Sequence, residues 1–112
     1  MIRPKQVFLV VEPVDMRWGM ERLSCHVQHY LGQPPNQGSA WAFTNRARTR
    51  LKLLVWDGTG VWLCQRRLHR GCFHWPRRGD SVCRLDGKAW QWLIRGVEWQ
   101  RLQAGVADHW QV

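Results

Sequence analysis

Four cationic side chains recur at every second position near the middle of the chain: Arg46, Arg48, Arg50 and Lys52. Alternate side chains of an extended strand point to the same side, so this spacing predicts a ladder of four positive charges on one strand face. Like charges in a row repel one another, and folding alone gives no reason to gather them. The ladder therefore predicts binding to a polyanion, either nucleic acid or an acidic protein surface.

The composition of the whole chain supports an acidic partner. The formal net charge is +9, the pI is about 10.7, and fourteen of the 17 basic residues are arginine. The planar guanidinium suits bidentate contacts with phosphate, which favours nucleic acid. A solvated basic edge that prevents strand-to-strand aggregation is the alternative interpretation. The candidate nucleic-acid-binding residues are Arg46, Arg48, Arg50, Lys52, Arg66, Arg67, Arg70, Arg77 and Arg78.

Nine tryptophans are far more than a chain of 112 residues ordinarily contains. Large aromatic side chains let a small domain bury much apolar surface with few residues, so most of them are expected in the core. One or two are expected at the surface as stacking platforms or partner anchors. The candidates that interleave with the arginines are Trp56, Trp62 and Trp75.

Other chemistries find little support in the residue spacing. Structural zinc sites usually pair closely spaced cysteines, whereas the candidate ligands here fall on both faces of a predicted strand. Those candidates are Cys64, His69, Cys72 and His74. No local signature places a thiolate beside a base, and two-metal phosphoryl transfer needs several converging carboxylates. Only eight acids are present, and three of them already fit helix caps or turns: Asp15, Asp57 and Asp86. The sequence predicts no catalytic residues, no metal and no cofactor.

The length fits one domain. The four cysteines have no paired spacing, so free thiols in a reducing cytoplasm are expected. No signal peptide is recognisable, and the apolar run at residues 7–11 is too short to span a bilayer. We expect a cytoplasmic protein that does not engage a membrane.

The first half of the chain predicts a strand at residues 7–11 and then a helix over residues 16–31. Asp15 would cap this helix, and Met16, Met20, Leu23, Val27 and Leu31 would form its buried stripe. Gly19 inside the helix suggests a close approach by another element. A loop over residues 33–39 leads to a second strand at residues 40–44.

The centre of the chain predicts a β-hairpin. A basic turn at residues 45–49 precedes two strands, residues 51–56 and 61–67, joined by Asp57-Gly58-Thr59-Gly60. Pairing of Trp56 with Val61 places Arg50 opposite Arg67, so basic side chains gather at the open end of the hairpin.

The last third predicts a short strand at residues 71–75, a turn at residues 77–80 and a helix over residues 87–95 capped by Asp86. The expected fold is a single small α+β domain with a twisted antiparallel sheet, a central hairpin and two packing helices. Its predicted bounds are residues 7–103, between tails at residues 1–6 and 104–112.

Four sequence blocks resemble one family in order and spacing: residues 13–17 (PVDMR), 51–60 (LKLLVWDGTG), 66–76 (RRLHRGCFHWP) and 94–99 (IRGVEW). Together they span most of the chain and resemble the Orf2-like protein of the insertion-sequence-66 transposons. That protein carries the name TnpB and is distinct from the RNA-guided nuclease with the same label. The resemblance implies an accessory protein encoded beside a separate transposase, and it designates no catalytic residues.

The resemblance implies two kinds of partner, DNA at the transposon ends and the transposase of the same element. We expect a non-enzymatic accessory factor that binds the DNA backbone, the transposase or both through the basic hairpin. A scaffold for the transposase without direct DNA binding is the alternative. The chain departs from the family pattern at Trp18, Ala47, Thr49 and His69. The acids usual at the last two positions are absent, which makes the hairpin more cationic.

Overall fold

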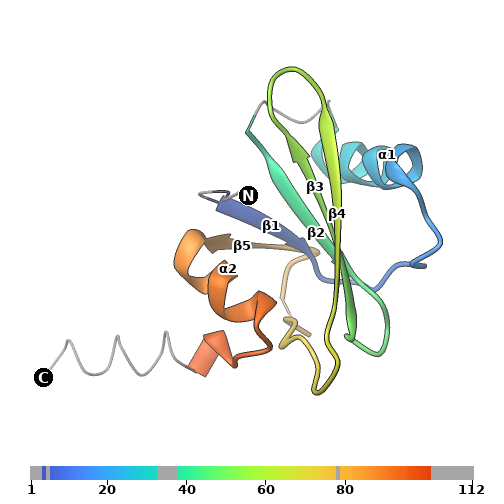
Figure 1. Ribbon diagram of the computed structural model, residues 1–112. Helices are drawn as coiled ribbons and strands as arrows, with labels where there is room; N and C mark the ends of the chain where they lie inside the picture. The colour runs from blue at the N-terminus through green and yellow to red at the C-terminus, as the bar shows by residue number, and fades with distance from the viewer. Residues whose placement is uncertain (1–3, 5, 33–37, 78, 102–112) are drawn as a thin grey trace, which may run out of the picture.

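The computed structural model describes residues 4, 6–32, 38–77 and 79–101. It confirms a single small α+β domain, with a five-stranded sheet in the order β4-β3-β2-β1-β5 (Figure 1). Residues 99–101 are also helical. The strands are β1 (Gln6–Val10), β2 (Ala40–Thr44), β3 (Arg50–Trp56), β4 (Val61–Arg67) and β5 (Val82–Asp86), and the longer helices are α1 (Met20–Leu31) and α2 (Gly87–Ile94).

The sheet is mixed, so the prediction of a wholly antiparallel sheet is wrong for one pair of strands. β1 and β2 run parallel, with Phe8 opposite Trp41 and Leu9 opposite Ala42. Parallel neighbours need a crossover connection, which α1 supplies between these two strands. The other three strand pairs are antiparallel.

Both faces of the sheet are covered, each by one helix (Figure 1). α1 packs Leu23 and Val27 on one face, against Trp41, Phe43 and Leu54. On the other face, the core contains Ala89, Trp90 and Leu93 of α2 with alternate residues of β1, β2 and β3, together with Phe73, Trp75 and Trp99. Because successive side chains of a strand point to opposite faces, each of these strands contributes apolar residues to the cores on both sides of the sheet.

α1 begins four residues later than the sequence predicts. Asp15 accepts a hydrogen bond at Oδ1 from the backbone N–H of Arg17 (2.8 Å), so its carboxylate closes a local turn and does not cap the helix. The N-cap is Gly19, where an added Cβ would meet no atom within 4 Å, so the predicted close approach is also wrong. The buried stripe is narrower than predicted, because Met20 and Leu31 are 38% and 39% exposed.

The predicted register of the central hairpin is confirmed to the residue, although β3 begins at Arg50, one residue earlier than predicted. β3 and β4 pair antiparallel with Trp56 opposite Val61 and Arg50 opposite Arg67. The pairing extends unbroken through all seven residues of each strand. The open end of the hairpin therefore lies where the sequence placed it, seven residues from the turn.

The prediction of a strand at residues 71–75 is wrong. This segment is irregular, although Phe73, Trp75 and Pro76 are buried within it. Its bonds between backbone groups are local or go to a turn: the Phe73 N–H donates to the carbonyl of Arg48 (2.7 Å), and the Trp75 N–H donates to the carbonyl of Phe73 (3.0 Å). The sequence pattern of this segment correctly predicts that its large side chains are buried, but it wrongly predicts that its backbone pairs with another strand.

The fifth strand is one that sequence reasoning missed. β5 pairs antiparallel with β1 and so encloses β1 within the sheet. It runs directly into α2, whose predicted cap is confirmed, since Asp86 Oδ1 accepts from the Ala89 N–H (2.8 Å). Among the described residues, no helix is long and apolar enough to cross a membrane. The predicted tail at residues 104–112 lies outside them.

Candidate nucleic-acid interface

The turn between β2 and β3 is built on Asn45. Its Oδ1 accepts hydrogen bonds from the backbone N–H groups of Thr49 (2.9 Å) and Arg50 (3.2 Å), and its carbonyl accepts from Arg48 N–H (3.1 Å). Arg46 and Arg48 therefore lie in a turn and not in an extended strand. The predicted ladder of four cations on one strand face is wrong, because this local bonding ends the extended conformation before Arg50.

Lys52, the last member of the predicted ladder, points into the protein. Its side chain is only 6% exposed, and its Nζ donates a hydrogen bond to the carbonyl of Trp18 (2.7 Å). It lies on the face of β3 that packs toward α1, next to Leu54. Lys52 therefore anchors the segment that precedes α1 and is not available to an external anion.

Exposed cations nevertheless gather at the open end of the hairpin. Arg50 and Arg67 lie directly opposite each other in the strand register, and both side chains are exposed. The Thr49 carbonyl accepts from Leu68 N–H (3.0 Å), which holds the β2–β3 turn beside the residues that follow β4. We name this surface the cationic end; its members are Arg46, Arg50, Arg66, Arg67 and Arg70.

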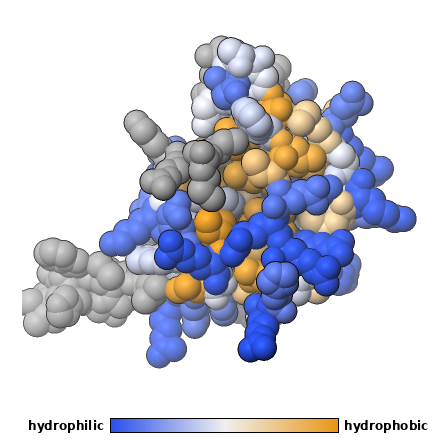
Figure 2. All heavy atoms as spheres, viewed as in Figure 1, coloured by the Kyte–Doolittle hydropathy of each residue, from blue (hydrophilic) through white to orange (hydrophobic). Residues whose placement is uncertain are grey.

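The cationic end includes side chains on both faces of the sheet, because Arg66 projects to the opposite face from Arg67. The Nε of Arg66 donates to the carbonyl of Ile94, at the end of α2. Figure 2 shows hydrophilic side chains gathered around hydrophobic residues that remain exposed on this face of the molecule. Arg66 and Arg67 line the same groove as Leu51, Leu53 and Trp62, so the cationic end adjoins an apolar surface.

In the part of the chain that the structure describes, no carboxylate forms an ion pair with the cationic end. Among the described residues, the one ion pair within 4.0 Å joins Arg17 to Asp15 (2.7 Å), neither of which belongs to the cationic end. Arg50 and Arg67 consequently face each other unneutralised, an arrangement that destabilises a pair of strands. Solvent ions or an external polyanion must balance them.

The three candidate partner anchors differ in exposure. Trp75 is 3% exposed and donates its Nε1–H to the carbonyl of Val10 (2.8 Å), so it is a core residue and the prediction of an anchor is wrong. Trp56 is half-buried against the α1 core. Trp62 is 54% exposed and is the candidate that the structure leaves free for a partner.

The β3–β4 turn holds Trp62 in a defined orientation. Asp57 Oδ1 accepts from the N–H groups of Thr59 (2.8 Å) and Gly60 (2.8 Å), and its Oδ2 accepts from Trp62 Nε1–H (2.7 Å). The hydrogen bonds from Thr59, Trp62 and Gly60 lower the pKa of Asp57 from 3.8 to about 2. The carboxylate is therefore the form that organises this turn.

We expect the Trp62 indole N–H resonance to titrate with a midpoint near pH 2. Because the folded-state pKa of Asp57 is depressed, the stabilisation is complete above 3.8 and is lost as the pH falls through about 2. A proton NMR titration measures the midpoint, and the buried Trp75 indole N–H reports whether the fold is intact. An Asp57→Asn variant should show no such titration, and a wild-type midpoint near 3.8 would contradict the hydrogen-bonding scheme.

An apolar groove of about 600 Å³ lies beside Trp62, between the hairpin and α2. Its floor comes from β3 and its far wall from α2, and Arg66 and Arg67 border it. Sequence reasoning missed this site, because its members come from three elements whose packing no local pattern encodes. The apolar lining residues are Leu51, Leu53, Trp62, Cys64, Trp90 and Ile94.

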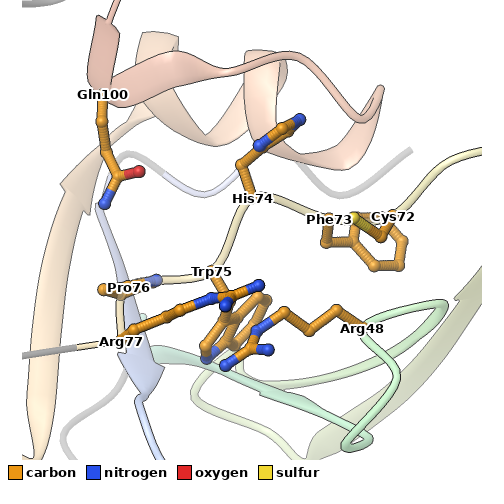
Figure 3. Close-up of a pocket in the computed structure, with 8 residues that line it drawn as sticks. All are labelled: Arg48, Cys72, Phe73, His74, Trp75, Pro76, Arg77 and Gln100. Atoms are coloured by element: carbon orange, nitrogen blue, oxygen red, sulfur yellow. The ribbon is translucent and has the colours of Figure 1, made fainter.

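The remaining candidate cations occupy a different place. Arg48 and Arg77 line a separate cavity formed with the irregular segment after β4, shown in Figure 3. Arg78 lies outside the described residues. In the part of the chain that the structure describes, no three histidine, cysteine or acidic side chains lie close enough to hold a metal ion. The candidate zinc ligands near residue 70 therefore do not converge there.

Comparison with known proteins agrees with the four sequence blocks. The family model of the IS66 Orf2-like proteins matches residues 5–104. Uncharacterized protein y4hO of Sinorhizobium fredii is 31% identical over 98 residues, covering 88% of this chain and 85% of its own length. Uncharacterized protein y4jC of the same organism is 29% identical over 101 residues, covering 90% and 86%. No solved structure matches the chain. The chain belongs to the IS66 Orf2-like family of transposition accessory proteins.

Proposed function

We propose that this protein is a non-enzymatic accessory factor that binds the DNA backbone at the cationic end during transposition. The observation that carries the proposal is the register of the hairpin, which sets Arg50 directly opposite Arg67 with no counter-ion among the described residues. Phosphates along a duplex supply the missing negative charge at closely spaced points. The family assignment favours DNA of the mobile element as the polyanion.

The contacts would provide affinity and little sequence discrimination. Exposed arginines on a turn and at strand ends reach phosphates, whereas reading base edges needs an element that enters a groove. Recognition of the transposon ends would then depend on the transposase, with this protein strengthening or positioning the complex. The same surface also suits acidic side chains of the transposase.

Salt dependence tests the DNA interaction. With about five phosphates engaged, the logarithm of the affinity for duplex DNA should fall with the logarithm of salt concentration at a slope of about −4.5. A variant with Arg50→Ala and Arg67→Ala should lose about 1.8 from the magnitude of that slope. The matched control removes two exposed cations near the opposite edge of the sheet, Arg84 and Lys88, and should keep the wild-type slope.

Two results would reject direct DNA binding at this surface. One is the absence of binding by the wild-type protein at low salt. The other is an equal change of slope in the two double variants, because non-specific attraction by total charge would treat them alike. Either result would leave the second function below as the remaining role.

The groove beside Trp62 supports a second function, docking of the transposase. β4 is an edge strand, with β3 on one side and no strand of the described chain on the other. An extended segment can add to such an edge through backbone hydrogen bonds and place alternate side chains in an adjoining groove. Because Arg66 and Arg67 border the groove, the occupant we propose is a segment that alternates apolar and acidic residues. Co-purification of the two proteins after nuclease treatment tests this function without DNA.

A further inference from the structure

A cavity of about 480 Å³ lies where the β2–β3 turn meets the irregular segment after β4. Arg48 reaches it from the turn and Arg77 from the end of the segment, and Figure 3 shows their side chains extending toward each other across Trp75. His74 and Gln100 also line it. No carboxylate is among the lining residues, so two guanidinium groups share the space without a counter-ion.

The backbone of Arg48 is held in an unfavourable conformation. Its φ is +59°, which makes it the one non-glycine residue with positive φ in the described part of the chain. Side chains with a Cβ adopt this conformation rarely, and glycine adopts it readily. Hydrogen bonds on both sides maintain it, from Arg48 N–H to the carbonyl of Asn45 and from Phe73 N–H to the carbonyl of Arg48. An arginine at a backbone position that favours glycine indicates a functional role for its side chain.

The side chain of Arg48 also lacks a partner for a buried donor. Its Nε is shielded from solvent and has no hydrogen-bond acceptor among the described residues. A buried donor on a charged group is costly to leave unpaired, and such groups in folded proteins usually have a partner. An acceptor supplied from outside would satisfy it.

Acidic residues on the far side do not neutralise these arginines. Glu12 and Asp80 line a neighbouring cavity of about 330 Å³ that Arg48 and Arg77 also border. Neither carboxylate approaches within 4.0 Å of a cation in the described chain, where the ion pair is Arg17 with Asp15. The two guanidinium groups therefore keep their hydrogen-bonding capacity on the side of the larger cavity.

We propose that the Arg48–Arg77 cavity is a phosphate-binding subsite that takes one phosphate of a nucleic-acid strand. The oxygens of a phosphate group are arranged tetrahedrally, so two guanidinium groups can approach it from different directions, whereas the two oxygens of a carboxylate lie in one plane. The proposal rests on the proposed DNA binding and deepens it. The cationic end attracts the strand through exposed charges, and this subsite holds a single phosphate in fixed geometry.

Phosphate titration followed by NMR tests the subsite on its own. The Nε–Hε resonance of Arg48, which is shielded from solvent, should shift when inorganic phosphate is added to the wild-type protein. Arg48→Gly removes the side chain and suits the positive φ, so this variant should fold at least as stably. Its phosphate binding, followed through the backbone amide resonances of His74 and Trp75 that line the cavity in both proteins, should be about tenfold or more weaker. Arg77→Ala should weaken binding as well. Arg84→Ala is the control, because Arg84 is exposed on β5 and belongs neither to this cavity nor to the cationic end, and it should bind phosphate as the wild type does.

The second arm uses short oligonucleotides with and without a 5′-phosphate. Competition with inorganic phosphate by both oligonucleotides assigns the subsite to backbone phosphodiesters, and competition by the phosphorylated one alone assigns it to strand ends. Competition by neither would overturn the assignment to nucleic acid and would point to a phosphorylated protein or a small phosphate ester. An equal response of wild type and Arg48→Gly to phosphate would overturn the subsite itself. The change of salt slope in the Arg50 and Arg67 double variant reports the cationic end separately, so failure of one proposal can be told from failure of the other.

Discussion

Replacing Trp75 with alanine should lower the free energy of unfolding by about 3–5 kcal/mol. The indole is 3% exposed, packs among residues of the sheet and α2, and donates to the carbonyl of Val10 (2.8 Å). Its removal leaves a cavity in the core and an unpaired carbonyl in β1, and both effects destabilise the folded state. Urea denaturation followed by circular dichroism measures the change.

Trp62→Ala is the matched substitution at the surface. Because this indole is 54% exposed, its loss should change the free energy of unfolding by less than about 1 kcal/mol, most of it from the hydrogen bond to Asp57. It should nevertheless weaken co-purification with the transposase, since exposed tryptophans beside an apolar groove are typical interface anchors. Equal destabilisation by the two substitutions would contradict the assignment of one tryptophan to the core and the other to the surface.

The parts of the fold that the sequence predicts well depend on local signals. The hairpin register follows from the turn at Asp57 and Gly58 together with strict alternation in both strands, and the structure reproduces it. The cap at Asp86 is equally local, since its carboxylate bonds a backbone N–H three residues away. In each case the deciding contacts lie within a few residues of each other.

The errors arise where the deciding contact is distant in the sequence. β5 pairs with β1 more than seventy residues earlier, and no nearby signal distinguishes it from the loop that precedes it. The segment at residues 71–75 has the apolar pattern of a strand, yet its backbone bonds go to the β2–β3 turn and to itself. The periodicity of apolar residues indicates which side chains are buried, but it does not indicate which element they pack against.

In the candidate site too, features set by local contacts were predicted and features set by distant contacts were not. The gathering of arginines at the open end of the hairpin was predictable, because it follows directly from register. The prediction of a cationic ladder was wrong for two reasons. Hydrogen bonds to Asn45 hold the backbone of Arg46 and Arg48 in a turn, and Lys52 donates to the carbonyl of Trp18, 34 residues earlier. The convergence of Arg48 with Arg77 depends on two loops meeting across the sheet end, and spacing alone carries no sign of it.

Lys52 and Arg50 provide a direct test of which cations serve the fold and which serve a partner. They lie two residues apart on the same face of β3, yet Lys52 is buried and Arg50 is exposed. Lys52→Ala should lower the free energy of unfolding by roughly 1.5–3 kcal/mol, because it removes the hydrogen bond from a charged donor to the Trp18 carbonyl. Where the variant remains folded, its salt slope on duplex DNA should equal that of the wild type.

Arg50→Ala should have the opposite profile. Its stability should stay within about 0.5 kcal/mol of the wild type, since the side chain is exposed and its removal relieves repulsion with Arg67. The magnitude of the salt slope should fall by about 0.9, the contribution of one phosphate contact. Denaturant titration and DNA binding measured on the same two preparations give both quantities. A loss of slope with Lys52→Ala and none with Arg50→Ala would show that the anion depends on Lys52 and its contact with the Trp18 segment, and would place the interface away from the cationic end.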